Sequence, residues 1–140
     1  MPRQEMYVAD LMTRNVLTIK PDDRVVDHLD IFKKHGIHHV PVVDGEGHVV
    51  GLVSEKDFEN YVNIVKIMQD RDNPVAVRDV MTSPVFTYSE EIGIDAAAQA
   101  MIDNDIHAIV IRNRTEELAG ILTSTDLLRH LANRDRWNKF

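Results

Sequence analysis

The feature that most constrains the fold is an internal repeat with an offset of 69 positions. The tetrapeptide Asp-Leu-Met-Thr at 10–13 recurs as Asp-Val-Met-Thr at 79–82, and Ile-His at 37–38 recurs at 106–107. No gap is needed between the two copies. Because chance matches do not keep one register, the pattern predicts one structural unit used twice.

The hydrophobic pattern predicts the same order of elements in each copy. Residues 16–19 predict a short strand. A helix follows, with Val25, Leu29 and Phe32 at helical spacing and Gly36 as its C-terminal cap. The matching positions in the second copy are Ile94, Ala98 and Met101.

The rest of each copy predicts a hairpin and a second helix. Residues 39–43 and 49–53 predict two strands, separated by the turn sequence Asp-Gly-Glu-Gly at 44–47. A helix is expected from about residue 55 to residue 68, and 68–76 is the expected linker.

The sequence of each half therefore predicts the element order strand, helix, strand, strand, helix. A half of about 65 residues cannot bury all of its apolar surface alone. We expect an α+β fold in which two β-α-β-β-α repeats, 1–70 and 71–140, pack sheet to sheet about a pseudo-two-fold axis as one intimate pair.

Composition narrows the function classes. The chain has no Cys, which excludes a disulfide framework, a Cys-based zinc site and a thiol nucleophile. Its start lacks the apolar core of a secretion signal, and no apolar run approaches the ~20 residues that span a bilayer, so we expect a soluble, cytoplasmic protein. A net charge of −7 makes nucleic acid an unexpected partner and requires local donors for any phosphate.

The motif Gly, two apolar residues, Ser or Thr, two residues, Asp stands at 51–57 and again at 120–126. In each copy a strand ends and a helix begins with Ser54 or Thr123 at its N-cap. The N–H groups of the first helical turn are an expected anion site. Asp57 and Asp126 lie one turn further on the same side, where a carboxylate can accept bonds from both hydroxyls of a ribose.

The same spacing has a second interpretation. Ser or Thr followed three residues later by an acid is a capping box, which stabilises a helix with no ligand. The two interpretations differ in what they predict for Asp57→Ala and Asp126→Ala. If the residues are only caps, each substitution lowers the stability of the protein by about 0.5–2 kcal/mol and there is no ligand binding to lose.

The two motifs, the Asp-x-Met-Thr openings and the segment His-Val-Pro-Val-Val-Asp at 39–44 together resemble a tandem pair of CBS domains over residues 8–131. The resemblance implies a non-enzymatic regulatory module that senses AMP, ADP or ATP in clefts between the repeats, with no obligatory cofactor. The regulated protein is a separate, unidentified chain. S-adenosylmethionine binding and a ligand-free structural or dimerisation module are the alternatives.

The resemblance also implies the site residues, because family clefts combine the ribose Asp of one repeat with a base pocket of the other. In one cleft, Thr123, Thr125 and Asp126 would hold phosphate and ribose, with Thr18, Ile37 and His38 at the base. In the mirror cleft, Ser54, Lys56 and Asp57 would do so, with Thr87, Ile106 and His107 at the base. Leu52 and Ile121 complete the ligand-binding set.

The two implied clefts differ. Lys56 stands where the other copy has Thr125, so we expect the Lys56 cleft to favour more phosphate charge, unless Lys56 is a solvated surface residue. Val110 replaces Pro41, which would leave one base pocket reshaped or empty. His38 and His107 are expected either as hydrogen-bonded core residues or near the phosphates, where their charge would tie affinity to pH.

Other candidate sites are weaker. His35, His38 and His39 lack the spacing of a metal site, and Ser54 with Asp57 lacks the base and orienting group of a catalytic triad.

The helix at 58–68 is apolar on two faces, which predicts a homodimer. The basic tail at 129–140 is either a frayed helix end or a contact for a partner or nucleic acid.

Overall fold

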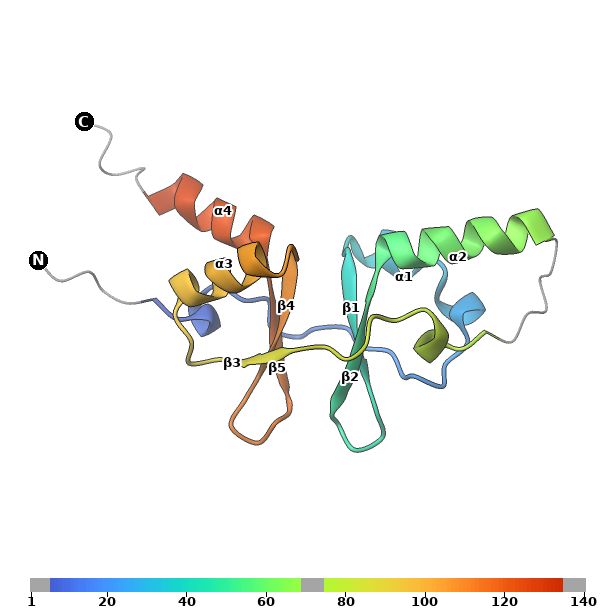
Figure 1. Ribbon diagram of the computed structural model, residues 1–140, viewed down its shortest axis with the longest axis horizontal. Coiled ribbons are helices and arrows are strands. Elements are labelled where there is room, and N and C mark those ends of the chain that lie inside the picture. Colours follow the sequence, from blue (N-terminus) through green and yellow to red (C-terminus); the bar gives the residue numbers. More distant parts are fainter. Residues whose placement is uncertain (1–5, 69–74, 135–140) are drawn as a thin grey trace, which may run out of the picture. The chain divides into compact units, whose positions relative to one another are not determined.

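The computed structural model describes residues 6–68 and 75–134, and the chain divides into two compact units. The Asp57 unit comprises Leu17–Val85, and the Asp126 unit comprises Met1–Val16 together with Phe86–Phe140. Each unit combines helices with a small sheet (Figure 1). The predicted α+β class with two repeats is therefore confirmed.

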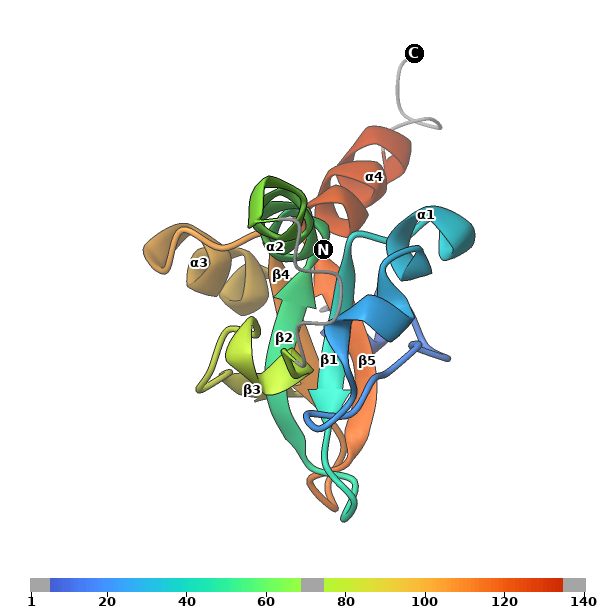
Figure 2. The same ribbon diagram turned by 90° about the vertical axis from the view of Figure 1, so that its right-hand side faces the viewer.

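The Asp57 unit is built on a hairpin. Strands β1 (His39–Val43) and β2 (Val49–Ser54) pair antiparallel. Helices α1 (Ile31–His35) and α2 (Glu55–Met68) lie at the end of the hairpin opposite its turn (Figure 2). The predicted hairpin and second helix are confirmed.

The Asp126 unit contains a three-stranded sheet in the order β3-β4-β5. Strand β3 (Thr87–Ser89) pairs parallel with β4 (Ala108–Arg112), which pairs antiparallel with β5 (Leu118–Thr123). Helix α3 (Ile94–Asp103) precedes β4, and α4 (Ser124–Arg134) follows β5 directly.

The leading segment of each repeat packs in the unit that contains the other repeat's hairpin. Thr13 and Ile121 exchange two backbone hydrogen bonds of 2.8 and 3.1 Å in the Asp126 unit. Thr82 and Leu52 do the same in the Asp57 unit, again at 2.8 and 3.1 Å. The compact units therefore do not coincide with the halves 1–70 and 71–140 along the chain.

The two cores follow this exchange. Val77, from the second repeat, is fully buried in the core of the Asp57 unit, where Phe32 and Phe58 meet edge to face with ring centroids 5.2 Å apart. Val8 and Met12, from the first repeat, are buried in the core of the Asp126 unit. Burying an aliphatic side chain of this kind contributes roughly 1.5–3 kcal/mol, so each unit depends on a segment of the other repeat.

The predicted strand at 16–19 is wrong as a full strand, because only Ile19 pairs, in a single parallel bridge to Val42. The equivalent segment of the second copy does form β3. Proline has no N–H to donate to a neighbouring strand, and Pro41 occupies the place held by Val110 in β4. Pro21 likewise lacks the N–H that its counterpart Glu90 donates to the Arg112 carbonyl at 3.1 Å, so donors are missing on both sides of Ile19 and the first copy pairs at one residue.

The predicted first helix is only partly confirmed. Residues 25–28 form a 3₁₀ helix, α1 is a separate short helix, and Leu29, expected in the core, is 44% exposed. Val and Asp are poorer helix formers than the Ala residues of α3, which is continuous. Gly36 does cap α1 at φ 62°, as predicted.

Candidate functional site

Each Ser/Thr-x-x-Asp motif forms a reciprocal cap at a strand-to-helix junction. The Ser54 N–H donates to Asp57 Oδ2 at 3.0 Å, and the Asp57 N–H donates to Ser54 Oγ at 3.1 Å. In the other copy, the Thr123 N–H donates to Asp126 Oδ2 at 2.9 Å, and the Asp126 N–H donates to Thr123 Oγ1 at 3.2 Å. The capping-box interpretation is therefore confirmed in both motifs.

The caps use only part of each side chain. Both hydroxyls accept a hydrogen bond and keep a proton to donate. Within the described residues, no hydrogen bond reaches Oδ1 of Asp57. Both carboxylates are thus fixed by Oδ2, and the cap does not use Oδ1, which in Asp126 lies 3.6 Å from Arg129 Nη1, so capping does not exclude a ligand.

The free N–H groups at the helix starts are fewer than the sequence suggested. The Glu55 N–H donates to the His38 carbonyl at 2.9 Å, and the Ser124 N–H donates to the His107 carbonyl at 2.8 Å. The N–H groups of Asp57 and Asp126 already donate to the capping hydroxyls. Of the first three residues of each helix, this leaves one N–H without an acceptor within residues 6–68 and 75–134, that of Lys56 in α2 and that of Thr125 in α4. A phosphate here would depend on one N–H, the hydroxyl and side-chain cations.

Around these caps, the two units carry different charges. Glu55 Oε2 lies 2.8 Å from His38 Nδ1 in the Asp57 unit, whereas Ser124 occupies the Glu55 position in the other copy. Arg129 Nη1 lies 3.6 Å from Asp126 Oδ1, whereas Asn60 occupies the Arg129 position. The repeat therefore preserves the caps and changes their charged neighbours.

The histidines of the repeat are not core residues. His38 and His107 are both exposed, and the side chain of His38 is 77% exposed. The core interpretation of these histidines is wrong, because both lie in the connections between α1 and β1 and between α3 and β4, where they are exposed. Their backbone carbonyls accept hydrogen bonds from the first residues of α2 and α4, and the His38 ring also contacts Glu55 of α2.

The remaining site residues lie close to the caps or on the flanking strands. Ile37 and Ile106 are half-buried just before β1 and β4. Leu52 is half-buried in β2, Ile121 is buried in β5, and Thr87 is half-buried in β3. Thr18, Lys56 and Thr125 are exposed.

The structure brings together those predicted site residues that belong to the same repeat. His39 is the register partner of Ser54, and Ala108 is the partner of Thr123, so Ile37-His38 and Ile106-His107 lie beside their own caps. The implied clefts combine residues of both units. Those cross-repeat combinations stay predictions.

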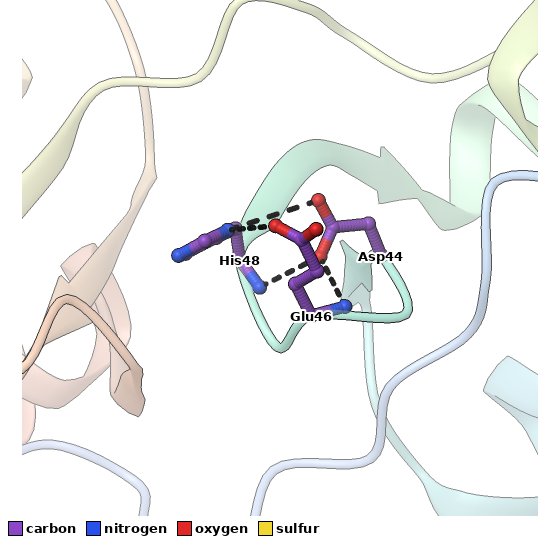
Figure 3. A group of neighbouring side chains, drawn as sticks. All are labelled: Asp44, Glu46 and His48. Atoms are coloured by element: carbon purple, nitrogen blue, oxygen red, sulfur yellow. Dashed lines mark hydrogen bonds and ion pairs between the residues drawn. The ribbon is translucent and has the colours of Figure 1, made fainter.

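A third cluster of polar side chains lies at the turn of the β1–β2 hairpin and was not singled out from the sequence. Asp44, Glu46 and His48 place one potential metal-ligand atom each within 4.8 Å of one another (Figure 3). Asp44 Oδ1 accepts 2.9 Å bonds from the N–H groups of Glu46 and His48, and these bonds, that of His48 first, lower the pKa of Asp44. They explain the cluster as turn chemistry.

Comparison with known proteins identifies the family. The family model for the CBS domain matches residues 8–64 and again residues 77–133. The chain belongs to the CBS domain family. The two matches contain the two capped motifs, so the repeat seen in the sequence is a pair of CBS domains.

Solved CBS pairs have the same fold. The CBS domain pair of protein MJ0100, in complex with 5′-methylthioadenosine and S-adenosyl-L-methionine, is 24% identical with a TM-score of 0.80, covering 94% of this chain and 99% of that one. CBSX2 in complex with AMP is 25% identical with a TM-score of 0.76, covering 93% and 98%.

Sequence relatives are often longer than this CBS pair. An uncharacterised protein of Methanopyrus kandleri is 29% identical over 128 residues, which is 90% of this chain and 63% of the relative. The chain spans less than two thirds of the first two curated relatives that it matches. Within the described ranges, no helix has both the length and the apolar character needed to cross a bilayer.

Proposed function

We propose that this CBS pair is a regulatory module that binds an adenosine-containing ligand through its two Ser/Thr-x-x-Asp motifs. The observation that carries the proposal is the geometry of Asp57 and Asp126. Each carboxylate is held by a backbone N–H through one oxygen, beside a hydroxyl that can still donate, and its other oxygen takes no part in the cap, although in Asp126 that oxygen also lies 3.6 Å from Arg129 Nη1. A fixed acceptor of this kind suits the paired hydroxyls of a ribose, and its charge-assisted bonds contribute ~1.5–3 kcal/mol each.

The similar proteins support the ligand class. AMP is bound by CBSX2, and 5′-methylthioadenosine and S-adenosylmethionine by the MJ0100 pair, so adenosine is common to all three ligands. Adenine nucleotides are the ligands that we favour. S-adenosylmethionine is the second candidate, because the MJ0100 pair is in complex with it and with 5′-methylthioadenosine.

The test is a calorimetric titration of nucleotide-stripped protein with AMP, ATP and S-adenosylmethionine. Asp57→Asn and Asp126→Asn are the informative variants, because the amide oxygen can still accept the capping bond while the charge for the ribose is lost. We expect each to weaken binding at its own motif by about tenfold or more, equivalent to one charge-assisted bond.

Glu46→Ala, which removes one carboxylate at the distant hairpin turn, is the control and should leave affinity unchanged. No saturable binding of any of the three ligands would favour the alternative, a ligand-free structural or dimerisation module. Binding that ignores both Asn variants would place the ligand elsewhere.

We further propose that the module acts as a homodimer on a separate target protein. Each unit leaves large apolar side chains exposed on its helices, among them Ile64 at 55% on α2 and Leu128 at 64% on α4. On α4, Leu131 lies one turn from Leu128 and is 49% exposed, and adjoining exposed apolar side chains are typical of association sites. A ligand that binds two arrangements of the assembly with different affinities would shift the equilibrium between them, and the target protein would respond to that shift.

A further inference from the structure

The two capped motifs differ most in the charges next to the aspartate. In the Asp126 motif, Arg129 Nη1 lies 3.6 Å from the oxygen that the cap leaves over, and the two preceding residues are the uncharged Ser124 and Thr125. One cation therefore offsets one carboxylate. A phosphate that approaches this motif meets no uncompensated negative charge from these residues.

The Asp57 motif has a different balance. It carries a second carboxylate, Glu55, at the first residue of α2, and an uncharged Asn60 at the position of Arg129. Lys56 offsets one of the two carboxylates. While the His38 ring that contacts Glu55 is neutral, the motif keeps one negative charge.

The position of Glu55 matters as much as its charge. Its N–H is the first of α2 and is already bonded to the His38 carbonyl, and its side chain is 39% exposed. An anion at this helix start would find one free N–H and a carboxylate within the same turn. An uncharged or cationic group would not be repelled there.

We propose that the two motifs select different adenosine ligands: the Asp126 motif takes a 5′-phosphorylated nucleoside, and the Asp57 motif takes an adenosine derivative whose 5′ substituent carries no negative charge. Arg129 and Glu55 are the specificity-determining residues. The inference rests on the proposed function, and it departs from the expectation that Lys56 makes its own motif the site for more phosphate.

The experiment isolates each motif in the full chain. Asp57→Asn leaves the Asp126 motif intact, and Asp126→Asn leaves the Asp57 motif intact. Each variant is titrated with AMP and with 5′-methylthioadenosine, which share adenosine and differ in charge. We expect the first variant to prefer AMP and the second to prefer 5′-methylthioadenosine, each by about two- to fivefold, the effect of one partly exposed charge.

Exchange of the neighbouring residues then tests the cause. Arg129→Asn in the Asp57→Asn protein should weaken AMP about fivefold and leave 5′-methylthioadenosine unchanged. Glu55→Ser in the Asp126→Asn protein should strengthen AMP by a similar factor. Arg114→Asn is the matched control, because Arg114 is an exposed cation of the same unit paired with Glu91, away from the motif.

The outcomes separate this inference from the function on which it rests. If both ligands bind and respond to the Asp variants, but their ratio does not respond to Arg129→Asn or Glu55→Ser, the selectivity is overturned and the nucleotide module stands. An equal loss of both ligands in Arg129→Asn also overturns it, since Arg129 would then act only on the shape of the site. If neither ligand binds the unmutated protein, the selectivity is overturned, and the nucleotide module also fails only if ATP and S-adenosylmethionine do not bind either.

Discussion

The carbonyl oxygen of Thr13 lies 2.7 Å from the point where a Cβ atom on Gly120 would stand. The two residues come from different repeats and meet inside the Asp126 unit, next to their paired backbone hydrogen bonds. In the other unit, a Cβ on Gly51 would meet the side chain of Met81, which also comes from the other repeat. The glycine that opens each capped motif thus faces the crossing segment, and at Gly120 the contact atom is backbone.

We predict that Gly120→Ala destabilises the protein by about 1–3 kcal/mol, the usual cost of forcing an atom into a packed core. The contact atom is backbone, so it cannot turn aside as a side chain would. Urea denaturation measures the loss. Gly45→Ala is the control, because nothing lies within 4 Å of its added Cβ, and it should stay within ~0.5 kcal/mol of the parent.

The exchange of leading segments predicts which fragments fold. Residues 17–85 contain the whole core of the Asp57 unit, including Val77, whereas residues 1–70 lack Val77 and the partner of Leu52. Circular dichroism during thermal unfolding should show a cooperative transition for 17–85 and not for 1–70. Cooperative transitions at the same temperature in both fragments would mean that the crossing segment contributes little to the core.

Removal of a capping hydroxyl should reduce stability and leave the aspartate in place. Ser54→Ala and Thr123→Ala are each expected to cost about 0.5–2 kcal/mol, because the N–H of Asp57 or Asp126 loses its acceptor. Exchange of the two hydroxyl residues, Ser54→Thr and Thr123→Ser, keeps the acceptor and should be nearly neutral. Chemical unfolding of all four variants measures their stability. An equal loss of stability in the Ala variants and in the exchanged variants would mean that side-chain packing, not the capping bond, causes the loss.

The carboxylate of Asp23 should make the stability of the protein depend on pH in the acid range. Burial raises the pKa of Asp23, but bonds from the Lys20 N–H and from His28 Nε2, both at 3.0 Å to Oδ2, outweigh it and hold the pKa below its ordinary value of 3.8. A lowered pKa in the folded state contributes stability above pH 3.8, which disappears as the pH falls through the folded value.

Asp23→Asn should therefore be less stable than the parent at pH 7, with the difference shrinking below about pH 4. Urea unfolding of both proteins at pH 7, 5, 4 and 3 measures it. A difference that stays constant over this range would mean that the charge of Asp23 is not involved.

Association should be visible in sedimentation. We expect the mass of a dimer, and we expect Leu128→Glu, on an exposed position of α4, to weaken it because a charge would enter an apolar interface. Asp95→Lys, a charge change on an exposed position of α3, is the control. A monomer at all concentrations would contradict the proposed homodimer.

Several features were predictable because they depend on local spacing. The hairpin turn at 44–47, the cap at Gly36 and the start of α2 at Glu55 each follow from residues within a few positions of one another. The capping box was also a local prediction, since Ser54 and Asp57 are three residues apart. The strand at 16–19 failed because its pairing depends on a distant residue, Pro41, which cannot donate a hydrogen bond.

The sequence by itself determined the repeat, the α+β order of elements and the two capped aspartates, because periodicity and capping act between near neighbours. Tertiary structure decided which repeat supplies each unit's crossing segment, why Gly51 and Gly120 have no side chain, and that Arg129 stands beside the oxygen of Asp126 that the cap does not use. These relationships depend on where the backbone returns in space and on how a side chain is oriented within its helix.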